Sequence, residues 1–145
     1  MSVLIDTNVL LRRAQPGHPL HASAVDSVAR FLARSTPVYF TPQNIAEFWN
    51  VATRPADKNG LGLPHATVLA EIAAIESLLI LLPDAPAVCP EWKRLVTTHR
   101  VTGVKVNDAR LVAFMSVFRI KSILTFNTGD FTRYPFIAAL HPSEV

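Results

Sequence analysis

The sequence begins with Val3-Leu4-Ile5-Asp6-Thr7-Asn8, a short apolar run that ends in an acid and two polar residues. About a hundred residues later, the segment Val106-Asn107-Asp108-Ala109 again carries an acid where a helix is expected to begin. In α/β domains, ligand sites form where strands end and helices begin. The pair Asp6 and Asp108 therefore suggests metal-ion chemistry at one edge of a sheet.

The rest of the chain alternates between strand-like and helix-like segments. Apolar runs bounded by turn residues predict strands at 2–5, 38–40, 79–82, 122–125 and 136–140, and helical spacing predicts helices at 7–13, 20–33, 43–53, 64–78, 90–100 and 107–118. This alternation favours a central, mainly parallel sheet of about four to five strands with helices on both faces. Between two of the helices, residues 56–63 are long and Gly-rich enough to be a mobile lid or a simple connector.

Length and composition predict one globular domain over residues 1–145. At this length, with half of its residues hydrophobic, the chain can bury a continuous core without disulfides. No apolar run is long enough to cross a bilayer, and no export signal precedes the first strand. Cys89 is the only cysteine, which favours a cytoplasmic location and a buried structural thiol.

The charge balance leans mildly towards a polyanionic partner. Lys and Arg total 14 against 11 Asp and Glu, giving a net charge of +3, which is well short of the dense basic patches of many nucleic-acid-binding proteins. The five histidines are dispersed and show no zinc-site spacing. The absence of a nucleophile elbow or a phosphate-binding loop disfavours triad hydrolases and NTPases.

Two further acids fall near the same predicted edge of the sheet. Glu47 lies in the helix after the second strand, and Asp130 lies in the turn after the strand at 122–125. The carboxyl ends of parallel strands meet at one edge, so the four acids are expected to gather there. Such carboxylates would repel one another unless a divalent ion neutralised them. Mg²⁺ and Mn²⁺ suit a set of ligands that are all oxygen.

Each acid alone also has an ordinary structural explanation. Asp6 and Asp108 could cap helices, and Asp130 could serve a Gly-Asp turn. A mid-helix acid such as Glu47 is usually solvated, although its apolar neighbours place it near the core boundary. Only the combination of all four is specific.

The same segments resemble the PIN-domain family. The resemblance rests on four motifs in order: Leu4-Ile5-Asp6-Thr7-Asn8, the helix with Glu47, Asn107-Asp108-Ala109-Arg110-Leu111-Val112-Ala113, and Leu124-Thr125-Phe126-Asn127-Thr128-Gly129-Asp130-Phe131. It runs from Val3 to Pro142, and the short chain resembles the VapC-type toxins of bacterial toxin/antitoxin modules. The stretch from Glu47 to Pro55, followed by Asn59-Gly60-Leu61-Gly62, also resembles a subset of these proteins and has no assigned role.

The resemblance implies a three-layer α/β/α fold and an endoribonuclease that depends on Mg²⁺ or Mn²⁺. The implied catalytic set is Asp6, Glu47, Asp108 and Asp130. Of these, the implied metal ligands are Asp6, Asp108 and Asp130. Asn127 is the alternative at the fourth position, as a neutral ligand or a substrate contact.

Supporting residues and partners follow from the same resemblance. Thr7 and Thr125 would orient the carboxylates or a water molecule, and Arg12 and Arg110 would contact substrate phosphates. The implied partners are an RNA substrate, a cognate antitoxin and a second copy of the chain. Apolar residues on the helices at 20–33 and 64–78 indicate an exposed face for such a homodimer.

Other functions stay open at this point. The chain could be a catalytically weak PIN scaffold that binds RNA or protein, or a DNA- or RNA-processing nuclease outside a toxin module. A flavodoxin-like or phosphotransfer module would need a Lys late in the sheet, whereas Lys121 precedes its strand and would lie at the wrong end.

Overall fold

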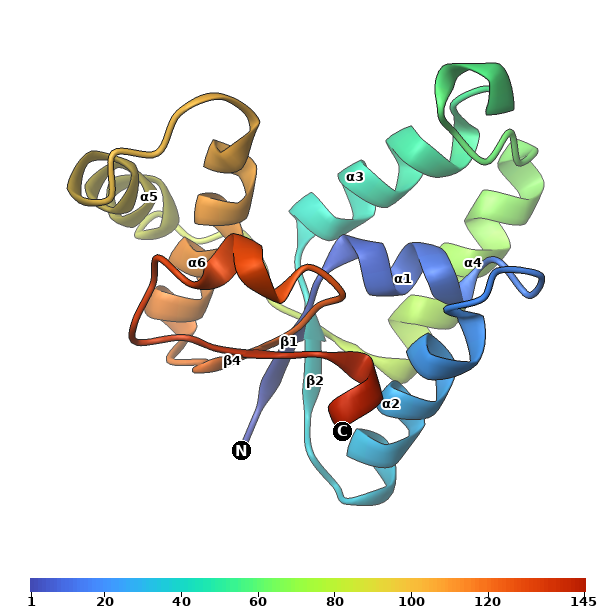
Figure 1. Ribbon diagram of the computed structural model, residues 1–145, viewed down its shortest axis with the longest axis horizontal. Helices are drawn as coiled ribbons and strands as arrows, with labels where there is room; N and C mark the ends of the chain where they lie inside the picture. Colours follow the sequence, from blue (N-terminus) through green and yellow to red (C-terminus); the bar gives the residue numbers. More distant parts are fainter.

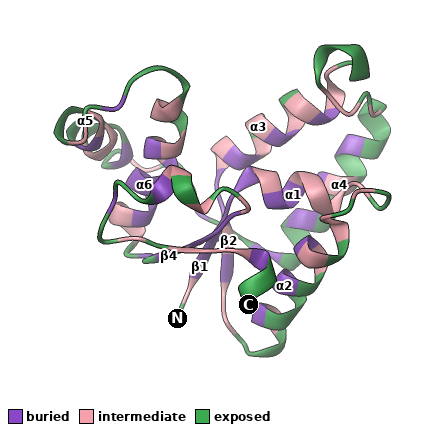
Figure 2. Cartoon of the chain, viewed as in Figure 1, coloured by how far each residue is buried: buried purple, intermediate pink, exposed green.

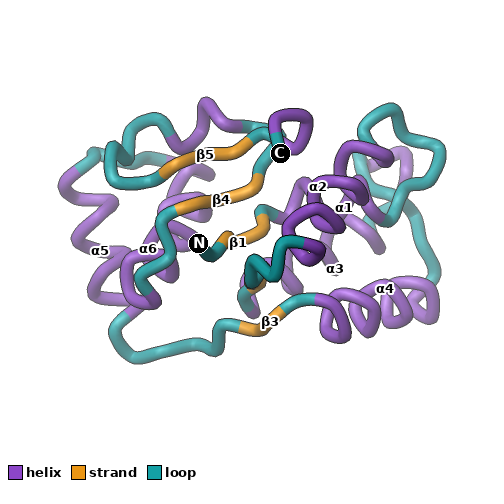
Figure 3. The backbone as a smooth tube through the Cα atoms, turned by 90° about the horizontal axis from the view of Figure 1, so that it is seen from below, coloured by secondary structure: helices purple, strands orange, loops and turns teal.

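A five-stranded parallel sheet forms the centre of the molecule. The structure is a computed structural model that describes residues 1–145. Its strands are β1 (Val3–Ile5), β2 (Val38–Phe40), β3 (Ile80–Leu81), β4 (Ser122–Leu124) and β5 (Ala138–Leu140). In space they follow the order β3-β2-β1-β4-β5, and Figure 3 shows β1, β4 and β5 side by side with β3 at the other edge. Every neighbouring pair is parallel, which confirms the predicted sheet.

Helices cover both faces of this sheet (Figure 1). One layer contains α1 (Thr7–Arg13), α2 (His21–Ala33), α3 (Pro42–Thr53) and α4 (His65–Leu78), and the other contains α5 (Val88–Thr98) and α6 (Val106–Phe118). Short 3₁₀ helices are η1 (Ala56–Lys58), η2 (Gly103–Lys105), η3 (Thr128–Phe131) and η4 (Pro142–Glu144). The helices supply most of the crossovers that parallel strands require. The predicted three-layer α/β/α architecture is therefore confirmed.

The central strand β1 shows why the sheet is apolar on both faces. Its side chains are completely buried, as the colouring of β1 in Figure 2 shows. Val3 and Ile5 pack in the core on the side of α1 to α4, and Leu4 packs in the core on the side of α5 and α6. Successive side chains of a strand point to opposite faces, so a strand that is covered on both sides is a continuous apolar run. Burying each such side chain contributes about 1.5–3 kcal/mol.

The strand register brings the segments after β1 and β4 to one edge of the sheet. Ile5 pairs with Leu124, and Leu124 pairs with Leu140. The pairing continues past the strands, because the Asp6 amide donates to the Leu124 carbonyl and the Thr125 amide donates to the Leu140 carbonyl, both at 2.9 Å. Asp6 and Thr125 therefore lie next to each other at the carboxyl edge.

Residues 56–63 form a compact cap on the end of α3. Three consecutive amides, from Leu61 to Leu63, donate to carbonyls at the end of this helix at 2.8–3.0 Å. The last carbonyls of a helix have no hydrogen-bond partners within the helix. Here the loop amides are those partners. Of the two sequence interpretations, the structure supports the connector, and the Gly-rich motif has a structural role as a cap.

Cys89 corrects one expectation from the sequence. Its side chain is exposed at the start of α5, so the prediction of a buried thiol is wrong. The buried side chains of this helix are Val88 and Leu95, and the one-residue step from Val88 turns Cys89 away from the core. None of the helices combines the length and the apolar character needed to span a membrane.

The cap on α3 predicts a specific intolerance at Gly60. A Cβ atom there would lie 2.0 Å from the Arg54 carbonyl oxygen, so the backbone would have to move. We expect Gly60→Ala to lower the free energy of unfolding, measured in urea, by about 1–3 kcal/mol, as other overpacked positions do. Gly17→Ala is the control, because no atom lies within 4 Å of the added group. Equal stability of the two variants would contradict the role of the cap.

Candidate metal centre

Asp6 lies directly after the central strand, and only 7% of its surface is exposed. Its carboxylate accepts hydrogen bonds from the Thr7 amide and the Thr125 hydroxyl, both at 2.8 Å, and from the Asn8 side-chain amide at 3.3 Å. Asp6 also caps the N-terminus of α1, so the structural and the functional explanations of this residue hold together. These three donors hold the carboxylate in one orientation at the carboxyl edge of the sheet.

Asn8 belongs to the site, although sequence reasoning assigned it no role. Its Nδ2 also donates to the Thr125 hydroxyl, and its Oδ1 accepts from the Phe126 amide, both at 3.2 Å. The Thr125 hydroxyl in turn accepts from the Asn127 amide at 3.0 Å. Asn8 and Thr125 thus join α1 to the segment after β4. The position of Asn8 two residues after Asp6 was the available signal.

Glu47 lies half-buried on α3, where Gln43 holds its carboxylate. Nε2 of Gln43 donates to Glu47 Oε1 at 2.7 Å and to the Asn107 carbonyl at 2.8 Å. Because Asn107 immediately precedes Asp108 on α6, Gln43 links the Glu47 side chain to the helix that carries Asp108. Sequence reasoning missed Gln43, although a polar residue four positions before an acid on a helix is a recognisable pair.

The orientation of α3 depends on a capping box between Thr41 and Asn44. The Thr41 hydroxyl accepts from the Asn44 amide at 3.1 Å, and Asn44 Oδ1 accepts from the Thr41 amide at 2.8 Å. The buried Asn44 also donates its Nδ2 to the Thr7 hydroxyl at 3.0 Å. Thr7 therefore connects the beginnings of α1 and α3, a tertiary contact that sequence spacing alone did not reveal.

Asp108 lies in the first turn of α6 and does not cap it. The helix begins at Val106, and Lys105 occupies the capping position without a side-chain capping bond. Trp92 anchors this start, because its Nε1 donates to the Val106 carbonyl at 2.8 Å. Capping therefore does not explain Asp108. It is a half-buried acid whose pKa is raised by burial and by the charges of Asp6 and Asp130.

Asp130 forms an ion pair with Lys105. Their Oδ1 and Nζ atoms are 2.6 Å apart, and the same Nζ lies 4.0 Å from Asp108 Oδ2. Asn127, the alternative at this position, has its amide bonded to the Thr125 hydroxyl. The structure therefore places both Asn127 and Asp130 in the segment that follows β4, next to the other acids.

Burial and repulsion between charges raise the pKa values of Asp6, Glu47 and Asp108. Burial raises the pKa of Asp6 to about 6, and the charges of Glu47 and Asp130 add to this effect against the hydrogen bonds from Thr125 and Thr7. Burial and then the charges of Asp6 and Asp130 raise the pKa of Asp108, also to about 6. The pKa of Glu47 is raised by burial and by the charge of Asp108. The four acids thus form one electrostatic cluster.

The donor set fits a hydrated divalent cation. No three His, Cys, Asp or Glu side chains converge on a common point, so the site is not a closed protein cage. Mg²⁺ usually keeps several waters and binds through one or two carboxylates. Asp6 and Asp108, which repel each other, are the two that would hold such an ion. The remaining acid oxygens are nearby, on Glu47 and on the lysine-paired Asp130.

The two arginines assigned to substrate binding make contacts within the chain. Arg12, at the end of α1, donates to Gln15 Oε1 at 2.7 Å. Arg110 donates to Gln43 Oε1 at 3.1 Å and to Asp84 Oδ1 at 3.3 Å. Of the two, Arg110 is therefore part of the site, because it holds the glutamine that in turn holds Glu47.

Comparisons with known proteins identify the family. The PIN domain family model matches residues 3–137, and the chain belongs to this family. Similar solved structures are a DNA-bound VapBC from Salmonella typhimurium (16% identity, 98% of each chain covered, TM-score 0.71), a toxin-antitoxin complex from Klebsiella pneumoniae (17%, 99% of each chain, 0.63) and VapC20, a sarcin-ricin loop cleaving toxin from Mycobacterium tuberculosis (18%, 83% of this chain and 86% of that one, 0.60). At such low identity, the structural likeness shows a shared fold alone. No curated protein matches the sequence.

The raised pKa of Asp6 predicts how the stability of the metal-free protein depends on pH. A folded pKa of about 6, above the ordinary 3.8, means that the folded state binds the proton more tightly. Ionisation of Asp6 therefore lowers the free energy of unfolding as the pH rises from about 4 through 6, by about 2–3 kcal/mol in total. Asp6→Asn removes this contribution while keeping an oxygen for the Thr7 amide.

Urea unfolding in the presence of a chelator measures this effect. The stability difference between Asp6→Asn and the wild type should grow in favour of the variant between pH 4 and pH 7. Asp26→Asn, on the exposed side of α2, is the matched control and should show no such trend. If the difference in the free energy of unfolding between Asp6→Asn and the wild type stayed constant from pH 4 to pH 7, the electrostatic account would be refuted.

Proposed function

We propose that this PIN-family protein is a nuclease that depends on a divalent metal ion and hydrolyses phosphodiester bonds in RNA. The observation that carries the proposal is the pairing of Asp6 with Asp108 at the carboxyl edge of the sheet. Burial raises the pKa of both carboxyl groups to about 6. The charges of Glu47 and Asp130 add to this effect at Asp6, and those of Asp6 and Asp130 add to it at Asp108. Family membership supports the same conclusion.

The chain's own residues divide the chemical work. A bound Mg²⁺ or Mn²⁺ would lower the pKa of water and neutralise charge that develops on the phosphoryl oxygens. Asp6 and Asp108 would hold the ion, and Asp6 is prevented from turning by its three hydrogen-bond donors. Glu47, oriented by Gln43, would accept a proton from the attacking water. The water oxygen would bond to phosphorus as the bond from phosphorus to the 3′ oxygen breaks. The 3′ oxygen would take up a proton from solvent, so that the products would be a 5′-phosphate and a 3′-hydroxyl.

RNA is the proposed substrate because of the resemblance to VapC-type toxins and because one structure with the same fold is a sarcin-ricin loop cleaving toxin. Exposed cations near the acids, such as Arg133, would contact phosphates. Cleavage of DNA in preference to RNA, or binding without cleavage, are outcomes that the activity assay below would detect.

A cognate antitoxin is the proposed protein partner. Several structures with the same fold are toxin-antitoxin complexes. A guanidinium or ammonium group from such a partner could bridge two carboxylates of the site and exclude the metal. A complex between the chain and the product of a neighbouring reading frame should therefore lose ribonuclease activity, and full activity in that complex would refute this mode of silencing. We propose a cytoplasmic location for the pair.

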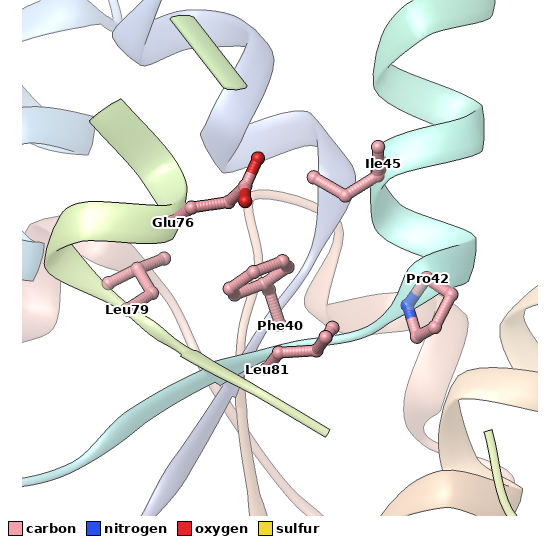
Figure 4. A pocket seen from close by; sticks show the side chains of 6 residues that line it. All are labelled: Phe40, Pro42, Ile45, Glu76, Leu79 and Leu81. Atoms are coloured by element: carbon pink, nitrogen blue, oxygen red, sulfur yellow. The ribbon is translucent and has the colours of Figure 1, made fainter. Parts of the chain in front are cut away.

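A homodimer is the proposed assembly, through a surface that we call the apolar strip: Leu69, Leu78, Ile80 and Leu81. All four side chains are exposed, on α4 and on the edge strand β3. The strip adjoins a hollow between α3 and α4 that is lined by Phe40, Ile45 and Leu79 (Figure 4). The expectation of a similar face on α2 was wrong, since no large apolar side chain of α2 is exposed.

The dimer proposal predicts the mass of the protein in solution. Light scattering at tens of micromolar protein should give about twice 15.9 kDa. Leu69→Ser combined with Leu81→Ser should shift the mass towards that of the monomer. Phe136→Ser, an exposed apolar position outside the apolar strip, is the control and should remain dimeric. A monomeric wild type would contradict the proposal.

The proposed activity predicts the behaviour of three site variants. Asp6→Asn and Asp108→Asn should lower Mg²⁺-supported cleavage of RNA by about a hundredfold or more, because losing even a group that supports a metal ligand costs about 10–100-fold. Glu47→Gln should keep metal binding and lose turnover. Asp26→Asn should cleave RNA like the wild type. The wild type assayed with a chelator of divalent metal ions should be inactive. Undiminished cleavage by Asp6→Asn or Asp108→Asn would refute the site.

A further inference from the structure

Lys105 places a positive charge inside the acidic site. It ends η2, three residues before Asp108, and its Nζ lies 2.6 Å from Asp130 Oδ1 and 4.0 Å from Asp108 Oδ2. No other Lys or Arg forms an ion pair with any of the four acids of the site, since the remaining ion pairs join Arg94 to Glu91 and Arg110 to Asp84. Lys105 is therefore the cation in direct contact with the site acids, while the charges of Arg133 and Arg110 act on Asp108 and Glu47 from further away.

The contribution of this ion pair to folding stability is small. The side chains of Lys105 and Asp130 are 43% and 31% exposed, and ion pairs in contact with solvent contribute little because water and salt screen them. The pair joins residues 25 positions apart, from the start of α6 to η3. Its main consequence is electrostatic, because it offsets part of the negative charge that would attract a metal ion.

A divalent ion and the Lys105 ammonium group are attracted to the same two carboxylates, Asp130 and Asp108. Mg²⁺ binds carboxylate oxygens at about 2.1 Å, which is closer than the ammonium group approaches Asp130. Two cations on one oxygen, or on adjacent oxygens, repel each other. Asp130 is therefore a stronger metal ligand once Lys105 leaves it, and the binding of an ion held by Asp108 alone is still weakened by the nearby ammonium charge.

We propose that Lys105 competes with the catalytic metal for the site. Its ammonium group pairs with Asp130 and lies beside Asp108 until a divalent ion displaces it. This inference rests on the proposed metal-dependent function. It also gives the Asn127 and Asp130 alternatives a physical basis, because Asp130 is the stronger ligand in the state from which Lys105 has withdrawn. Lys105 would thus set the metal concentration at which the site becomes occupied.

Calorimetric titration of the full chain with Mn²⁺, without RNA, tests the proposal. Lys105→Gln should bind Mn²⁺ about tenfold more tightly than the wild type, as expected for removing one nearby positive charge. Added salt should narrow the difference. Lys105→Arg should bind like the wild type. Lys121→Gln is the matched control, since this exposed lysine precedes β4 at the opposite edge of the sheet.

The outcomes separate this inference from the proposed function. If Lys105→Gln bound Mn²⁺ no more tightly than the wild type, the competitor role would be wrong while the metal site remained. If Lys121→Gln tightened binding equally, net charge and not position would be responsible, and the inference would also fail. If no variant and no wild-type sample bound Mn²⁺, the proposed metal centre itself would fall, and the inference with it. The Mn²⁺-induced rise in melting temperature, larger for Lys105→Gln, gives a second readout.

Discussion

The burial of one carboxylate at the end of the central strand is the constraint on which the rest of the site depends. Asp6 follows a strand that is covered on both faces, so its side chain enters the interior where the apolar run stops. A charge in such a place needs hydrogen-bond donors and a counter-charge. The donors are present in Thr7, Asn8 and Thr125. The neighbouring acids make the need for a counter-charge larger, which is why the site suits a cation.

The site is assembled from the beginnings of three helices, each tied to another by a side-chain bond. Asn44 joins α3 to α1 through Thr7, and Gln43 joins α3 to α6 through the Asn107 carbonyl. Arg110 completes the second link by bonding Gln43. The position of Glu47 therefore depends on α6 as well as on α3.

The sequence predicted the features that arise from local patterns. The buried strands and the alternation with helices follow from apolar periodicity, and the acids at the ends of strands follow from the geometry of a parallel sheet. It did not predict contacts that require two distant segments to meet. Lys105 and Asp130 are such a pair, as are Asn44 and Thr7. The interpretation of the loop at 56–63 stayed open because its amides bond carbonyls at the end of the preceding helix α3. Residue spacing alone does not reveal those hydrogen bonds.

Anomalous X-ray scattering from crystals grown with Mn²⁺ tests the central claim most directly, because it locates the ion without any assumption about activity. The account predicts a Mn²⁺ peak at coordination distance from carboxylate oxygens of both Asp6 and Asp108, with the Lys105 ammonium group withdrawn from Asp130. A Mn²⁺ site elsewhere on the surface, with Asp6 and Asp108 free of metal and Lys105 still paired with Asp130, would contradict it.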